Sequence, residues 1–211
     1  MSAIQHHVSD ELLAAYAAGN LSHAFSLVVA SHVSLCEQCR AGLEAHNVMG
    51  GVCLDETKSV TVSSGLKTDL LSRLDDPMDL PKTFARKGAL PGPIVAALKG
   101  KDPTWKKVGQ GVRQDILSEG DGGTARLLYI PAGQAVPDHS HNGLEMTLVL
   151  QGSFSDETGR YGVGDVEIAD ESLEHTPVAD PGEPCICLAA TDAPLRFRAF
   201  IPRLMQPIFR I

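Results

Sequence analysis

Hydrophobic residues recur at helical spacing in the first 75 residues of the chain. Ser9 precedes an acidic first turn and an apolar run over residues 12–18, a pattern that predicts a capped helix. Further helices are expected after the cap residue Ser22, over about residues 36–49 as far as Gly50 and Gly51, and over about residues 67–74. The pattern therefore predicts a small all-α unit of four helices.

The last of these helices carries an apolar stripe. Leu70, Leu71 and Leu74 would share one face at helical spacing. We expect this stripe to belong to the core of the helical unit. The alternative is that it packs on a partner protein.

The hydrophobic pattern changes after residue 76. Residues 77–103 carry five prolines among glycines and lysines, which is typical of a linker, with one short helix over residues 94–98. Beyond it, short β-branched or alternating segments separated by turn residues predict strands. These segments cover residues 105–112, 124–130, 145–150, 152–156, 165–168, 186–190 and 196–200. Such short, closely spaced strands are typical of a sandwich or jelly-roll barrel.

These patterns predict two domains. The helical domain would cover residues 1–76, the linker residues 77–103, the all-β domain residues 104–200 and a C-terminal tail residues 201–211.

Composition narrows the classes of partner and the compartment. The 211 residues carry a net charge of −8, which argues against direct binding to nucleic acid or to an anionic membrane. No apolar stretch is long enough to span a bilayer, and the N-terminus lacks the features of a secretion signal. Five cysteines, an odd number with short spacings, fit metal or redox chemistry in a reducing compartment. We therefore expect a cytoplasmic protein.

One candidate metal site lies in the helical region. His32, Cys36 and Cys39 are spaced so that successive members lie on one face of a helix or its first turn. Thiolate and imidazole ligands suit zinc, which takes four ligands in a closed structural site. The fourth ligand would be His6 or His7, with Cys53 as the alternative. A structural zinc would also stabilise a domain of this small size.

A second candidate site lies in the predicted strands. His139 and His141, two apart, would point to the same face of one strand, and Glu145 and His175 can complete the set. Such a site accepts Zn, Fe, Mn or Ni, and we expect a divalent metal there, with zinc the first choice. Cys185 and Cys187 would also share a strand face. They are candidates for redox sensing, and ordinary buried cysteines are the alternative.

Both metal motifs resemble known families. The upstream histidine with His32-x3-Cys36-x2-Cys39 resembles the zinc-binding anti-sigma domain, over roughly residues 1–75. That resemblance implies His7, His32, Cys36 and Cys39 as zinc ligands, with His6 the weaker choice for the first of them. The stretch Gly133-x5-His139-x-His141-x3-Glu145-x6-Gly152 is similar to the first cupin motif. The second cupin motif keeps Gly164 and His175, whereas Asp170, Ser172 and Ala179 replace its usual Pro, Gly and Asn.

A zinc anti-sigma motif followed by a cupin motif is the arrangement found in the zinc anti-sigma factors of the bacterial singlet-oxygen response, and the chain resembles this family. This resemblance implies a regulator, not an enzyme, that holds an extracytoplasmic-function sigma factor inactive. It also implies that the cupin-like domain senses singlet oxygen or related oxidants and that sensing releases the sigma factor. The alternatives are a metal-dependent cupin enzyme of the dioxygenase type, or a regulator whose cupin domain binds a small ligand.

Overall fold

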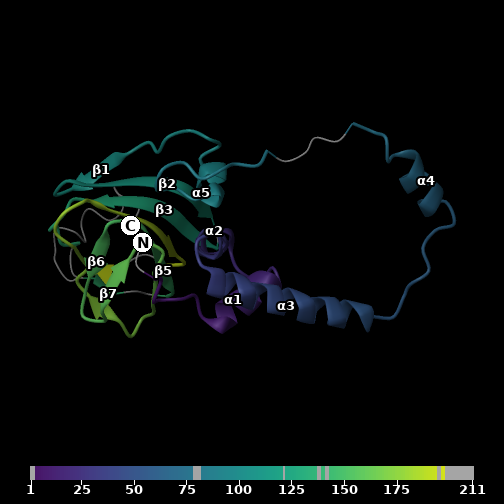
Figure 1. The fold of residues 1–211 in the computed structure, drawn as a ribbon, viewed down its shortest axis with the longest axis horizontal. Coiled ribbons are helices and arrows are strands. Elements are labelled where there is room, and N and C mark those ends of the chain that lie inside the picture. The colour runs from purple at the N-terminus through teal and green to yellow at the C-terminus, as the bar shows by residue number, and fades with distance from the viewer. Residues whose placement is uncertain are drawn as a thin grey trace.

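The computed structural model describes residues 3–77, 82–120, 122–136, 139–140, 143–193 and 196–197, with only the backbone given for residues 139–140 and 196–197. The helices are α1 (Asp10–Ala17), α2 (His23–Val33), α3 (Glu37–Asp55), α4 (Leu66–Ser72) and α5 (Gly92–Ala97). Within this part of the chain, no helix combines the length and the apolar character needed to cross a membrane. The helical N-terminal region predicted from the sequence is present (Figure 1).

Local sequence explains where the first helix begins but not where the third one ends. The Ser9 side chain accepts a hydrogen bond from the backbone N–H of Leu12, as expected of an N-cap. The prediction that Gly50 and Gly51 end the third helix is wrong, because α3 continues through both to Asp55. A glycine inside a helix costs about 1 kcal/mol relative to alanine. That cost weakens a helix without forbidding it, and neither glycine takes a positive φ.

The β region consists of one large sheet and two small ones among the described residues. Its strands are β1 (Lys106–Gly109), β2 (Val112–Gly120), β3 (Gly123–Ile130), β4 (His139–Ser140), β5 (Glu145–Gln151), β6 (Ser153–Ser155), β7 (Arg160–Gly162), β8 (Val166–Ala169), β9 (Glu174–His175), β10 (Val178–Ala179), β11 (Cys185–Thr191) and β12 (Arg196–Phe197). The sheet orders are β1-β2-β3-β11-β5-β8, β10-β6-β7 and β12-β4-β9. The sequence pattern missed β2 as a separate strand, because its central residues are mostly polar.

The large sheet has two differently covered faces. On the outer face, Phe25, Val28 and Val29 of α2 share one apolar core with Leu127, Leu148, Leu188 and other sheet residues. The short helix α5 packs beside α2 and adds Ile94 to this core. On the inner face, Ile130, Val149, Cys185 and Cys187 pack against Phe154, Tyr161 and Ala179 of the small β10-β6-β7 sheet. One continuous core thus joins the N-terminal helices to the β region (Figure 1).

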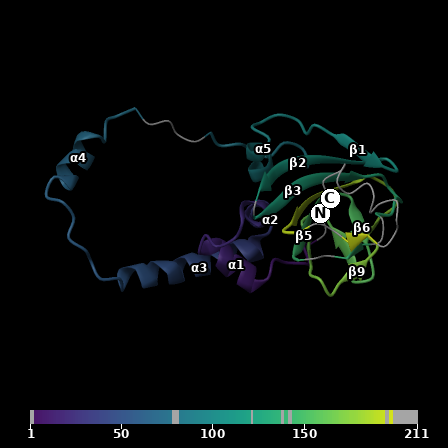
Figure 2. The same cartoon turned by 180° about the vertical axis from the view of Figure 1, so that it is seen from behind.

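The helix α4 lies apart from this body (Figures 1 and 2). All of its residues are exposed. Leu70 and Leu71 keep 58% and 56% of their surface accessible, and Leu74, in the turn after the helix, keeps 74%. The expectation that this stripe belongs to the core is therefore wrong. A further group of exposed apolar side chains occupies the second half of α3, namely Val48, Met49, Val52 and Leu54. We call these two sets together the apolar surface of α3 and α4.

Candidate metal centres

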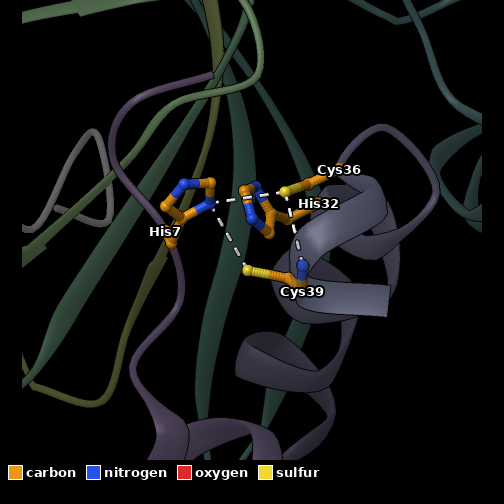
Figure 3. A group of neighbouring side chains, drawn as sticks. All are labelled: His7, His32, Cys36 and Cys39. Carbon is orange, nitrogen blue, oxygen red and sulfur yellow. Dashed lines mark hydrogen bonds between the residues drawn. The ribbon is translucent and has the colours of Figure 1, made fainter. Parts of the chain in front are cut away.

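Four residues from three separate segments meet in the N-terminal region (Figure 3). His7, His32, Cys36 and Cys39 each offer one ligand atom, and these atoms all lie within 4.8 Å of one another. His7 comes from the segment before α1, His32 from α2, and the cysteines from the start of α3. Two thiols and two imidazoles in one group are a donor set that suits tetrahedral zinc. This group could hold a metal ion.

The turn between α2 and α3 positions the two cysteines. His32 lies in the last turn of α2, and Cys36 is the N-cap of α3, so the motif bridges two helices. The Cys36 Sγ atom accepts a hydrogen bond of 3.5 Å from the Cys39 backbone N–H, in place of the usual capping oxygen. His7 Nδ1 lies 3.3 Å from the sulfur of Cys36 and 3.6 Å from that of Cys39. The three-residue spacing of Cys36 and Cys39 therefore brings the two sulfur atoms together at the N-cap of α3.

Burial and hydrogen bonding determine the protonation of the ligand atoms in this group. His32 Nδ1 lies 2.9 Å from the carbonyl oxygen of Gly164, and since a carbonyl only accepts, Nδ1 must donate. His32 Nε2 is buried and has no hydrogen-bond partner among the described residues, which suits a metal-ligating atom. Burial lowers the pKa of His32 to about 4, against the opposing effect of this hydrogen bond. Burial, with Cys36 beside it, raises the pKa of Cys39 to about 11. A bound dication would offset the cost of a buried thiolate.

The two alternative fourth ligands lie elsewhere. The ring of His6 packs on Tyr161 with 4.4 Å between ring centroids, and its Nδ1 atom lies 3.6 Å from the carboxylate of Asp165. Cys53 is exposed on α3. Among the three alternatives that the sequence leaves open, only His7 is in the group with His32, Cys36 and Cys39.

The structure describes part of the predicted cupin site. The backbone of His139 in β4 pairs with His175 in β9, while the side chain of His139 and all of His141 lie outside the described residues. Glu145 begins β5, is buried, and accepts a hydrogen bond of 3.0 Å from Thr147. Glu145 is also close enough to act electrostatically on His175.

Two carboxylates that the sequence analysis missed surround His175. Its Nδ1 atom lies 2.7 Å from Asp156 and 3.1 Å from Glu167, and ligand atoms of these three residues are close enough together to hold a metal ion themselves. Although burial opposes it, hydrogen bonding to Glu167 and Asp156 raises the pKa of His175 to about 9. Burial raises the pKa of Glu167 to about 7. Glu167 stands between the apolar residues Val166 and Ile168 in a strand. This charged residue within an apolar run is the sequence signal that could have revealed it.

Cys185 and Cys187 are both buried on the inner face of the large sheet. A hydrogen bond with Cys185, together with burial, raises the pKa of Cys187 well above its ordinary value. Reactive cysteines usually sit in exposed, electropositive places where the thiolate is favoured. This environment instead keeps Cys187 as a protonated thiol, and a redox role for the pair stays a prediction.

Comparison with known proteins matches both halves of the chain. Residues 95–194 match the family described as ChrR Cupin-like domain. The chain is 56% identical to the anti-sigma-E factor ChrR of Cereibacter sphaeroides, over 99% of both proteins. It is also similar to a chain in the crystal structure of Rhodobacter sphaeroides SigE in complex with the anti-sigma ChrR. That similarity has 54% identity and a TM-score of 0.81, and it covers 90% of this chain and 99% of the other. The chain therefore belongs to the ChrR family of anti-sigma factors.

Proposed function

We propose that this protein is an anti-sigma factor that binds an extracytoplasmic-function sigma factor and keeps it from core RNA polymerase. The observation that carries this proposal is the apolar surface of α3 and α4, which the chain leaves exposed. Exposed apolar patches of this kind mark protein-binding surfaces. The relative crystallised with SigE supports the class of partner. The role is regulatory, without turnover of a substrate, and its place is the cytoplasm, where the sigma factor acts.

The N-terminal group acts as a structural zinc site in this proposal. His7, His32, Cys36 and Cys39 would hold the ion, and together they join the N-terminal segment, α2 and α3. The zinc supplies free energy that fixes these three segments relative to one another. The start of α3 is then held in place, and the exposed half of the same helix faces the partner.

The cupin-like region is the sensor in this proposal. We assign His139, His141, Glu145 and His175 as ligands of a second divalent metal, with zinc the first choice. Asp156 and Glu167 would hold the His175 ring by its Nδ1 atom, as outer carboxylates commonly do. The finer parts of the fold belong to the same proposal: a four-helix domain over residues 1–76, a linker over 77–103, a closed jelly-roll barrel over 104–200 and a tail over 201–211.

Oxidation at or near the second site would release the sigma factor. Singlet oxygen or a related oxidant is the proposed signal, because imidazole and sulfur side chains are its electron-rich targets. Cys185 and Cys187 are candidate targets in addition to the metal ligands. Cys187 is close enough to Glu145 and Glu167 for both carboxylates to act on it electrostatically, so the pair lies near the proposed second metal.

Inhibition of transcription tests the proposal. The purified full chain, with zinc per chain measured, is added to Rhodobacter sphaeroides SigE, core polymerase and a SigE-dependent promoter. We expect transcription to stop near one chain per SigE. Cys36→Ser should lose one zinc and most of the inhibition, whereas Cys53→Ser, an exposed cysteine of the same helix, should keep both. Absence of SigE binding by the zinc-loaded chain would contradict the proposal.

A further inference from the structure

The N-terminal segment that carries His7 is docked on the cupin-like region. Asp165, in the turn before β8, accepts hydrogen bonds on one carboxylate oxygen from the backbone N–H groups of Gln5 and His6, at 2.7 and 2.9 Å. The backbone N–H of Val166 donates to the carbonyl of His6 at 3.1 Å. These bonds fix the backbone immediately before His7 to a turn more than 150 residues away in sequence.

The same turn also orients a second zinc-site residue. The Gly164 carbonyl receives the Nδ1–H of His32 and so directs Nε2 of that ring toward the two cysteines. Gly164 has a φ of +95°, and a Cβ atom there would lie 2.6 Å from the Ile4 side chain. Only glycine suits both the backbone conformation and the close approach of the N-terminal segment. One turn thus positions His32 directly and His7 through its neighbour.

Asp156, ten residues before Val166, contacts the predicted cupin ligand His175. Asp156 bonds to His175 Nδ1 at 2.7 Å through one oxygen and accepts from Thr158, at its N–H and its hydroxyl, through the other. The Thr158 hydroxyl lies 2.9 Å from the hydroxyl of Tyr161. The ring of Tyr161 in turn contacts that of His6. The contacts are continuous from the predicted cupin ligand to the residue next to His7.

We infer that residues 156–166 form a shared outer shell of the two metal sites, so that the state of the His175 site sets the metal affinity of the His7, His32, Cys36 and Cys39 site. This inference rests on the proposed zinc site. Groups in the outer shell typically change metal affinity by about 10- to 100-fold. Because linkage is reciprocal, occupancy of either site then changes the affinity of the other by the same factor. Asp156, Thr158, Tyr161, Gly164 and Asp165 are positioning residues in this arrangement.

Cobalt binding to the full-length protein tests the inference. Thiolate-to-cobalt charge transfer reports the site that contains Cys36 and Cys39, and replacing both cysteines by serine must abolish that absorption. We expect His175→Ala to lower the cobalt affinity measured by this absorption at least about fivefold. Asp156→Asn, which keeps the side-chain volume, should act in the same direction and serves if His175→Ala does not fold. Asp165→Ala should cost about tenfold or more.

A double-mutant cycle separates transmission from loss of stability. Tyr161→Phe removes the hydroxyl that meets Thr158 and keeps the ring that contacts His6. In that background, His175→Ala should have no further effect on the cobalt affinity of the cysteine site. Asp115→Asn is the matched control, because Asp115 lies in β2, outside residues 156–166, and its carboxylate accepts a hydrogen bond from the backbone N–H of Thr104.

The outcomes are distinct. Unchanged cobalt affinity in both His175→Ala and Asp156→Asn, with the charge-transfer absorption intact, overturns the inference and leaves the zinc site standing. An equal loss of affinity in the Asp115→Asn control also overturns it, because general destabilisation would then explain the data. Absence of the charge-transfer absorption in the unmodified protein refutes the zinc site and the inference together.

Discussion

Shortening the exposed leucines in α4 and in the turn that follows it should weaken sigma-factor binding without destabilising the free protein. Leu70 and Leu74 keep 58% and 74% of their surface exposed, so Leu→Ala at either position removes almost no packing from the chain itself. At Leu70, which lies inside α4, alanine also has a higher helix propensity than leucine. We therefore expect the thermal unfolding midpoint of each variant to equal that of the unmodified protein.

The size of the binding loss follows from the exposed fractions. Complete burial of a leucine side chain contributes about 1.5–3 kcal/mol. Scaled by the fraction still exposed, each leucine has about 1–2 kcal/mol left to gain when a partner covers it. Each Leu→Ala change should therefore raise the dissociation constant for SigE by about 5- to 30-fold. The loss should appear mainly as faster dissociation.

Surface plasmon resonance with immobilised SigE measures this loss. Val178→Ala is the matched control, because Val178 is 37% exposed on β10, in the cupin-like region, and its truncation should leave the dissociation constant unchanged. If Leu70→Ala and Leu74→Ala bind SigE as tightly as the unmodified chain, α4 is not a binding element. If instead both lower the unfolding midpoint, the leucines are packed in the free protein and the reasoning from exposure fails.

Three further predictions concern the core and the two metal sites. Val29→Ala, at a fully buried position between α2 and the large sheet, should lower the free energy of unfolding by about 2 kcal/mol; denaturation followed by circular dichroism should still show one transition for helices and sheet, and separate transitions would refute the shared core. Zinc affinity, measured by competition with a chelator, should rise with pH between about pH 6 and about pH 8. Loss of the Cys39 proton alone should contribute about a tenfold rise per pH unit, because the metal displaces this proton from a thiol whose pKa is about 11. His32 should add to that dependence only below its own pKa of about 4, and a flat profile would mean that Cys39 is not a ligand. Glu145→Ala should leave inhibition of SigE intact and blunt its release by singlet oxygen, and unchanged release in a transcription assay would make the second metal dispensable for sensing.

Local spacing was enough to predict that His32, Cys36 and Cys39 lie together in one group, which could hold a metal ion. His32, Cys36 and Cys39 are close in sequence, and the short connection between α2 and α3 brings them together. The family resemblance favoured His7 over His6, but the physical reason is the docking of the N-terminal segment on Asp165, a contact between residues far apart in sequence. The hydrogen bond from His32 to the Gly164 carbonyl could not be predicted for the same reason. In addition, every residue has a backbone carbonyl, so the residue type does not indicate this role.

The apolar stripe of α4 shows a different limit. A row of leucines at helical spacing has the same pattern whether the chain or a partner covers it. Only the three-dimensional position of Leu70, exposed on a helix apart from the body, separates the two cases. The sheet pattern was easier to predict for β3 and β5, which contain runs of apolar residues, than for β2, whose central residues are mostly polar.

The placement of α4 also determines how strongly and how reversibly a partner can be held. Residues 56–65 join α4 to the exposed half of α3. When α3 has bound a partner, the binding of α4 to the same partner is therefore an intramolecular event. A short flexible connection gives an effective concentration in the millimolar range. Two individually weak contacts can then combine into tight retention, while loss of either one returns the complex to weak binding. Release therefore requires that only one of the two helices be displaced.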